Sequence, residues 1–320
     1  MKKHEMIHGS LPGLFVLALL TFPIAPVTPE TALGTRIGAA VGAWVGPAAV
    51  VAQEAGPVES SVREGVPSDP DAYAGYAHTP LFRTSDRCMS CHNDVVGPDG
   101  MDLSIGFDWR ASMMANSARD PYWQAAVRRE VLDHPSVSEA IQNECAKCHM
   151  PMASYEARAA GEELGVFAHL PSNPMRTRAD TLAADGVSCT LCHQIQPDNL
   201  GTEESMVGGF RIDRTTAWGE RRLFGPFQVD SGRVTIMHSS ARYEPVEGDH
   251  IQSSELCATC HTLRTHAFGP GGEVIGELPE QVPYQEWAHS DYAGEQSCQS
   301  CHMPVVEDSI PVTGVLGVER

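Results

Sequence analysis

The sequence predicts a mainly α-helical fold made of short helices, long loops and one or two small β-hairpins. Its 320 residues include 29 Gly and 23 Pro, which interrupt regular elements and lengthen the loops between them. Aromatic side chains make up only 7% of the chain, a modest supply for a core built from side chains alone. One pentapeptide is repeated five times, which indicates that the helices wrap around bound groups.

The repeated pattern is Cys-x-x-Cys-His, and its five copies use all 10 cysteines. It is the attachment site of c-type haem: the two thiols form thioethers with the vinyl groups, and the histidine binds the iron from one face. Composition alone would produce roughly 0.01 copies by chance. We therefore predict five covalent haems c. The predicted attachment residues are Cys88, Cys91, Cys145, Cys148, Cys189, Cys192, Cys257, Cys260, Cys298 and Cys301. The predicted proximal iron ligands are His92, His149, His193, His261 and His302.

Other uses of paired cysteines explain the pattern less well. A structural zinc site needs two such pairs, and five pairs cannot be shared evenly between zinc ions. Thioredoxin-like redox pairs and disulfide frameworks do not require a histidine at the same offset in every copy. Because each haem is a large apolar body, we expect a stacked haem core that replaces much of the side-chain core.

Two apolar stretches precede the first motif. Lys2 and Lys3 come before apolar residues 11–25, and small apolar residues continue from 37 to 52, ending in a Val-Val-Ala sequence that resembles a signal-peptide cleavage site. The first stretch is too short to span a bilayer comfortably. We predict an export leader over 1–52, a flexible lead-in over 53–76 and a pentahaem domain over 77–320 in the periplasm or outside the cell. An uncleaved leader would tether the protein to the membrane.

The chain is strongly acidic, with a formal net charge of −19, and Lys147 is its single lysine outside the leader. Nucleic acid is therefore not expected as a partner. Redox partner proteins are expected, and a basic one would suit this surface, although an acidic surface also simply favours solubility.

The predicted elements follow local patterns along the chain. Apolar spacing predicts a helix over 107–132, broken near Asp120-Pro121, and another over 154–164. Two short apolar runs flank an Asp-Ser-Gly sequence within 227–236, so a short hairpin with its turn at 230–232 is predicted there. The Gly-Pro-Gly-Gly sequence at 269–272 is typical of a turn, so a second turn is predicted there. Each pentapeptide is expected to begin or end a short helix.

Seven histidines lie outside the leader and the motifs, and five haem irons would each offer a second face to a neutral imidazole. His169 is the weakest candidate. The predicted distal ligands are His78, His134, His238, His250, His266 and His289.

Methionine is the rival distal ligand. Met113, Met114 and Met237 are open alternatives. Met150 and Met303 directly follow proximal histidines, and we expect them to pack rather than ligate.

Several motif-bearing segments resemble the multihaem cytochrome c superfamily, in particular its cytochrome c-552/c-554-like group. The resemblance lies in DGVSCTLCHQ at 185–194, LFGPF at 223–227, SELCATCHTL at 254–263, and from GELPEQ at 276–281 to the last motif. It covers roughly 80–305, and it implies a chain of haems that carries electrons. It also favours His250, His266 and His289 as distal ligands.

Electron transfer is the predicted function, because the supply of histidines suits saturated irons. The alternative is a multihaem oxidoreductase with one open haem site that acts on a small nitrogen or sulfur compound. A tyrosine cross-linked to haem would suit that alternative, with Tyr243, Tyr284 and Tyr292 as candidates. A third interpretation is a subunit of a haem filament, with some distal ligands from a neighbouring chain.

Overall fold

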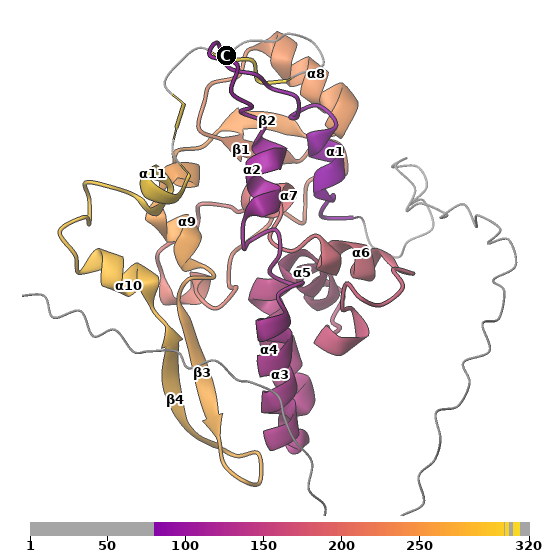
Figure 1. Cartoon of the computed structure of the whole chain (residues 1–320), viewed down its shortest axis with the longest axis vertical. Coiled ribbons are helices and arrows are strands. Elements are labelled where there is room, and N and C mark those ends of the chain that lie inside the picture. The colour runs from indigo at the N-terminus through magenta and orange to yellow at the C-terminus, as the bar shows by residue number, and fades with distance from the viewer. Residues whose placement is uncertain (1–79, 304, 307–309, 314–320) are drawn as a thin grey trace, which may run out of the picture. The chain divides into compact units, whose positions relative to one another are not determined.

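The computed structural model describes residues 80–303, 305–306 and 310–313. The predicted leader, the lead-in and His78 lie outside these residues. Within the described part, eleven α-helices and two two-stranded sheets confirm the helix-rich fold (Figure 1). None of the described helices combines the length and apolar character that crossing a bilayer requires.

The elements are short and are joined by loops and 3-10 turns. The helices are α1 (Ser85–Met89), α2 (Ile105–Ala111), α3 (Pro121–Asp133), α4 (Ser138–His149), α5 (Pro151–Ala159), α6 (Arg178–Ala184), α7 (Cys189–Cys192), α8 (Ser231–Ala241), α9 (Ser254–Ala258), α10 (Pro283–Ala288) and α11 (Cys298–His302). The strands are β1 (Arg222–Gly225), β2 (Glu244–Glu247), β3 (Leu263–Phe268) and β4 (Val274–Gln281). The 3-10 turns span Pro135–Val137, Val166–Ala168, Glu203–Ser205 and Asp249–Gln252.

The helix predicted over 107–132 is indeed broken, into α2 and α3. Asp120 caps α3 by accepting a hydrogen bond from the amide of Tyr122, and Pro121 occupies the first helical position, where no amide hydrogen is needed. The helix predicted over 154–164 forms as α5 but ends at Ala159. Gly161 has a φ of 79°, a left-handed conformation that stops a helix.

The hairpin predicted over 227–236 is wrong, because residues Ser231–Ala241 form α8. The side chain of Asp230 accepts hydrogen bonds from the amides of Gly232 and Arg233, so the expected turn is a helix N-cap. Strands β1 and β2 then pair in parallel, with α8 as the crossover between them (Figure 1).

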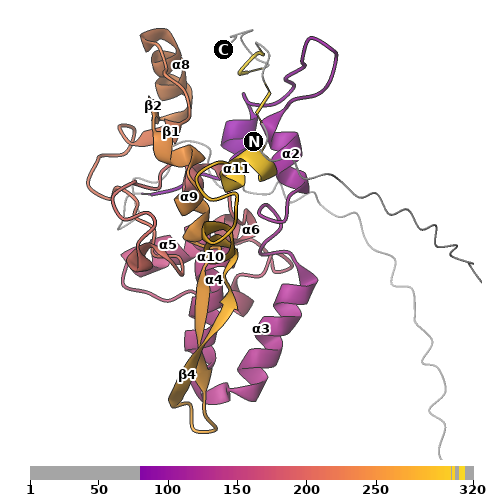
Figure 2. The same cartoon turned by 90° about the vertical axis from the view of Figure 1, so that its left-hand side faces the viewer.

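The second predicted turn is confirmed as the end of an antiparallel hairpin between β3 and β4. Gly272 takes a φ of 85°, and a Cβ there would lie 2.7 Å from the hydroxyl oxygen of Ser136. The hairpin tip therefore packs against the turn between α3 and α4 (Figure 2). Most β4 residues are exposed, including Val274 and Ile275.

The apolar core lies between the central helices. Trp123, Val127 and Val131 of α3 pack into one buried cluster with residues of α4, α5, α6 and α7. By contrast, α8, α10 and α11 have no buried residue. Side-chain packing thus stabilises the first half of the described chain more than its last third.

Candidate haem-binding site

The second pentapeptide ends a helix and the third and fifth begin one, as predicted, whereas helices end inside the first and fourth. The motifs lie on α1, α4, α7, α9 and α11. Side chains three positions apart face the same side of a helical turn, so the two thiols of a motif share one face. None of the ten thiols forms a disulfide; nine are partly buried and Cys301 is exposed. Among the described residues no three Cys, His, Asp or Glu side chains gather as ligands for one metal ion.

The motifs lie in contact with one another although they are far apart in sequence. The thiol of Cys88 lies against that of Cys189, which raises the pKa of Cys88 and lowers that of Cys189. The thiols of Cys148 and Cys260 form a second pair, which raises the pKa of Cys148. The first motif therefore meets the third, and the second meets the fourth.

The fourth motif also contacts the fifth and lies near the third. Burial raises the pKa of Cys192 to about 12, and the nearby thiols of Cys260 and Cys257 add to this effect. Burial likewise raises the pKa of Cys257 to about 12, with a further contribution from Cys298 of the fifth motif. The fourth motif is thus the common neighbour of the second, third and fifth motifs.

Three motif histidines are oriented by backbone carbonyls. The ring nitrogen Nδ1 lies 2.8 Å from the oxygen of Val312 for His92, and 2.6 Å from that of Phe224 for His193. Nδ1 of His149 is 3.0 Å from the oxygen of Ser117. A histidine that donates from Nδ1 to a carbonyl presents Nε2 to a metal, the usual arrangement of a ligand.

The surroundings of two of these rings favour the neutral, ligating form. Burial lowers the pKa of both His149 and His193. The His149 ring also stacks on Trp123, with centroids 4.3 Å apart and planes 5° from parallel. The accepting carbonyls lie 31 to 220 residues from the histidines, so no local sequence signal identifies them.

A cavity of about 1170 Å³ separates the third motif from the fifth, with His193 and His302 among the residues that line it. Trp109, Phe227 and Trp287 supply aromatic walls. This volume exceeds the ~300–1,000 Å³ of ordinary small-molecule sites. Paired thiols, histidines with Nε2 available and a cavity of this size together fit the attachment of c-type haem.

The predicted distal ligands are placed unevenly. His289 is exposed at the end of α10, and its Nδ1 lies 2.7 Å from the oxygen of Gln285, which leaves Nε2 available. His250 instead directs Nε2 to the oxygen of Ile195, at 2.9 Å, so only Nδ1 remains for iron. All six distal ligands stay predictions.

Three other candidates occupy peripheral positions. His134 directly follows α3 and His266 lies on β3, and their ring centroids are 6.1 and 6.3 Å from that of Phe268 on β3. His238 is exposed on α8. Met150 is fully buried, as the packing prediction requires, whereas Met303 is 59% exposed and lines the cavity between the third and fifth motifs.

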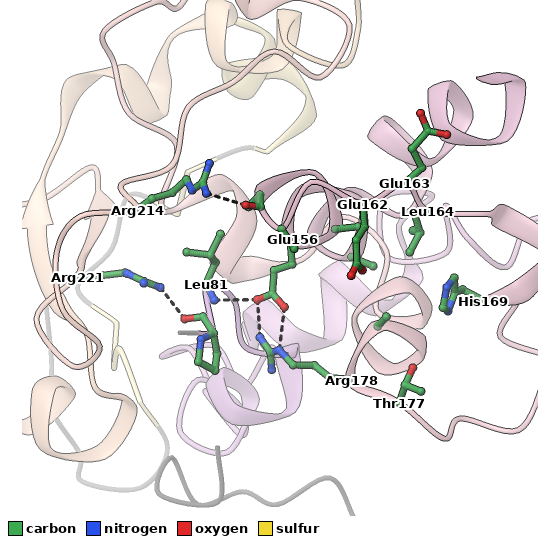
Figure 3. Close-up of a pocket in the computed structure, with 16 residues that line it drawn as sticks. Leu81, Glu156, Glu162, Glu163, Leu164, His169, Thr177, Arg178, Arg214 and Arg221 are labelled. Carbon is green, nitrogen blue, oxygen red and sulfur yellow. Dashed lines mark hydrogen bonds and ion pairs between the residues drawn. The ribbon is translucent and has the colours of Figure 1, made fainter. Parts of the chain in front are cut away.

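A second cavity, of about 740 Å³, lies away from the motifs (Figure 3). No cysteine or motif histidine lines it. Glu156 lies in its middle, with His169 on one side and Arg214 and Arg221 on the other. Nδ1 of His169 donates to Asp180 at 2.6 Å. This position supports the low rank of His169 among the candidate ligands.

Asp180 should make the free energy of unfolding depend on pH in the acidic range. Burial works to raise its pKa, but hydrogen bonds from His169 and from the amides of Arg176 and Thr177 hold it at about 2, below the ordinary 3.8. Its stabilising effect, about 2 kcal/mol, is complete above the unfolded pKa of 3.8 and is lost as the pH falls through about 2. Asp180→Asn should remove this pH dependence, as measured by denaturant unfolding at several acidic pH values. An unchanged pH profile in the variant would contradict the assignment.

No protein-family model matches the chain, and no curated protein matches it. One solved structure that it resembles is a penta-heme cytochrome c552 from Thermochromatium tepidum, with a TM-score of 0.44 and 19% sequence identity. The match covers 70% of this chain and 55% of that one, so this chain spans about half the length of the cytochrome.

Proposed function

We propose that the chain is a multihaem cytochrome c that transfers electrons through five covalently bound haems. The observation that carries the proposal is the contact network of the motifs, in which thiols of the first and third, second and fourth, and fourth and fifth motifs meet. Bound haem supplies one-electron iron chemistry. The network implies macrocycles close enough to exchange electrons.

The protein residues hold and separate these groups. Paired thiols fix each macrocycle to a helical turn, and the carbonyls behind His92, His149 and His193 orient the proximal rings. The contacts imply an order of first, third and fourth motif, with the second and fifth attached to the fourth. Export to the periplasm or cell exterior is part of this proposal, because c-type haem is attached outside the cytoplasm.

Intact mass and electron paramagnetic resonance (EPR) spectroscopy test this function directly. The exported chain should carry the mass of five haems, and the oxidised protein should show low-spin signals for all five irons. A colourless product with zinc or disulfides would overturn the proposal. A high-spin signal that shifts with nitrite or hydroxylamine would instead support the alternative, an oxidoreductase with one open haem.

His289→Ala should convert one haem iron from low spin to high spin, because Nε2 of His289 is available and its Nδ1 is already bonded to Gln285. The measurement is EPR of the oxidised protein. His169→Ala is the matched control, since His169 faces the cavity away from the motifs and its loss should leave the spectrum unchanged. Identical spectra for both variants would remove His289 from the ligand set.

A further inference from the structure

The histidine of the second motif and Ser117 bind each other through two hydrogen bonds. Nδ1 of His149 lies 3.0 Å from the backbone oxygen of Ser117, and the Ser117 hydroxyl donates to the backbone oxygen of His149, at 2.9 Å. The first contact fixes the tautomer of the ring and leaves Nε2 available for a metal. The second contact holds the backbone from which the ring projects.

Trp123 restricts the same ring from its face. The indole and the imidazole of His149 have centroids 4.3 Å apart and planes only 5° from parallel. An imidazole in this position cannot turn about its Cβ–Cγ bond without pushing one of its edges into the indole. Stacking covers the face of the imidazole and leaves its edge free, so Nδ1 keeps its carbonyl and Nε2 stays available.

The residues that restrict the ring are themselves held in place. Trp123 is 8% exposed and belongs to the buried cluster between the central helices. The side chain of Gln124 donates to the oxygen of Ala118, at 2.9 Å, which ties the start of α3 to the loop that carries Ser117. The indole and the carbonyl therefore keep a fixed position relative to each other, and the imidazole between them has one orientation.

This double constraint distinguishes the second motif from the other four. Within the described chain, His92 and His193 share the carbonyl contact at Nδ1, but neither ring stacks on an aromatic side chain. The rings of His261 and His302 make neither contact with the described residues. An effect of the stacked indole should therefore appear on one haem of the five.

We propose that Trp123 and Ser117 are positioning residues that fix the plane of the proximal imidazole on the second haem. This rests on the proposed function. The plane of an axial imidazole determines which d orbitals of the iron it overlaps. A ring locked by packing and hydrogen bonds keeps that overlap unchanged when the iron changes its oxidation state. The second haem can then exchange electrons without rearranging this ligand.

EPR spectroscopy of the oxidised five-haem protein tests this proposal, because the g values of a low-spin iron depend on the planes of its axial ligands. Trp123→Leu should shift the largest g value of one low-spin signal by more than its linewidth and leave the other four in place. Trp123→Phe, which keeps an aromatic face, should shift that signal by less than half as much. Ser117→Ala, which removes the hydroxyl and keeps the carbonyl, should also shift it, so the proposal is testable even where Trp123→Leu fails to mature.

Trp218→Leu is the matched control. The Trp218 ring contacts Tyr243 and the guanidinium of Arg83 but no motif histidine of the described chain, so its loss should leave all five signals unchanged. Denaturant unfolding measures the loss of packing that both tryptophan variants share, and the spectral shift then reports the ring orientation alone.

Two results would overturn the inference. One is a set of spectra in which neither Trp123→Leu nor Ser117→Ala differs from the unsubstituted protein. The other is a shift in Trp218→Leu as large as that in Trp123→Leu. A haem count by mass on the unsubstituted protein separates this failure from failure of the proposed function, because that count does not depend on Trp123.

Discussion

Replacing both thiols of the fourth motif, Cys257→Ala with Cys260→Ala, is expected to prevent folding. The matched change in the fifth motif, Cys298→Ala with Cys301→Ala, is expected to leave a folded protein with one haem fewer. The two double variants remove the same chemical groups, so a difference between them reports the position of each motif in the structure.

The reason lies in how deeply each motif is embedded. Ala258 and Thr259 of the fourth motif are 0% and 2% exposed, and the thiols of this motif meet those of the second and fifth motifs and lie near Cys192 of the third. The helix of the fifth motif has no buried residue. Losing the haem of the motif that neighbours three others should cost more than ~5 kcal/mol, the lower end of the stability of a domain.

Intact mass, visible absorption and thermal denaturation of the exported variants distinguish these outcomes. The fifth-motif variant should carry four haems and unfold cooperatively, whereas the fourth-motif variant should be degraded or recovered without a cooperative transition. Two variants of equal stability and equal haem content would show that the fourth motif is not the centre of the network.

The candidate attachment residues could be identified from the sequence because the motif is local. Five residues suffice to specify a pair of thiols and a histidine on one helical turn. The contacts between motifs were not predictable, because the intervals between first cysteines are 57, 44, 68 and 41 residues and do not encode which helices meet. The same limit applies to the carbonyl of Val312, which orients His92 from 220 residues away.

Local patterns also failed where one residue has two roles. Asp230 with Gly232 is typical of a hairpin turn, but the same side chain satisfies the first amides of a helix. The choice between them depends on the parallel pairing of β1 with β2, which needs a crossover rather than a tight turn. This is a tertiary preference, and no window around Asp230 contains it.

Glu156→Gln is expected to lower the free energy of unfolding by about 3 kcal/mol, and by no more than ~5 kcal/mol. One carboxylate oxygen accepts hydrogen bonds from the amides of Leu81 and Phe82, at 2.8 and 3.1 Å. The carboxylate also binds the Arg178 guanidinium in a two-point pair, at 2.7 and 2.9 Å. Both charged side chains are largely buried, with 21% of Glu156 and 15% of Arg178 exposed.

The amide of the variant has one acceptor oxygen for two backbone amides and a guanidinium, and its NH₂ group would face a cation. The variant therefore removes the carboxylate of a largely buried ion pair, which costs far more than losing a surface pair. Asp133→Asn is the matched control, because it breaks the exposed pair with Arg129 and should change stability by less than ~1 kcal/mol. Denaturant unfolding followed by circular dichroism measures both. Equal losses would show that the segment from Pro80 to Arg83 is not anchored through Glu156. A large loss in Glu156→Gln alone would show that this pair holds the start of the described chain against the core.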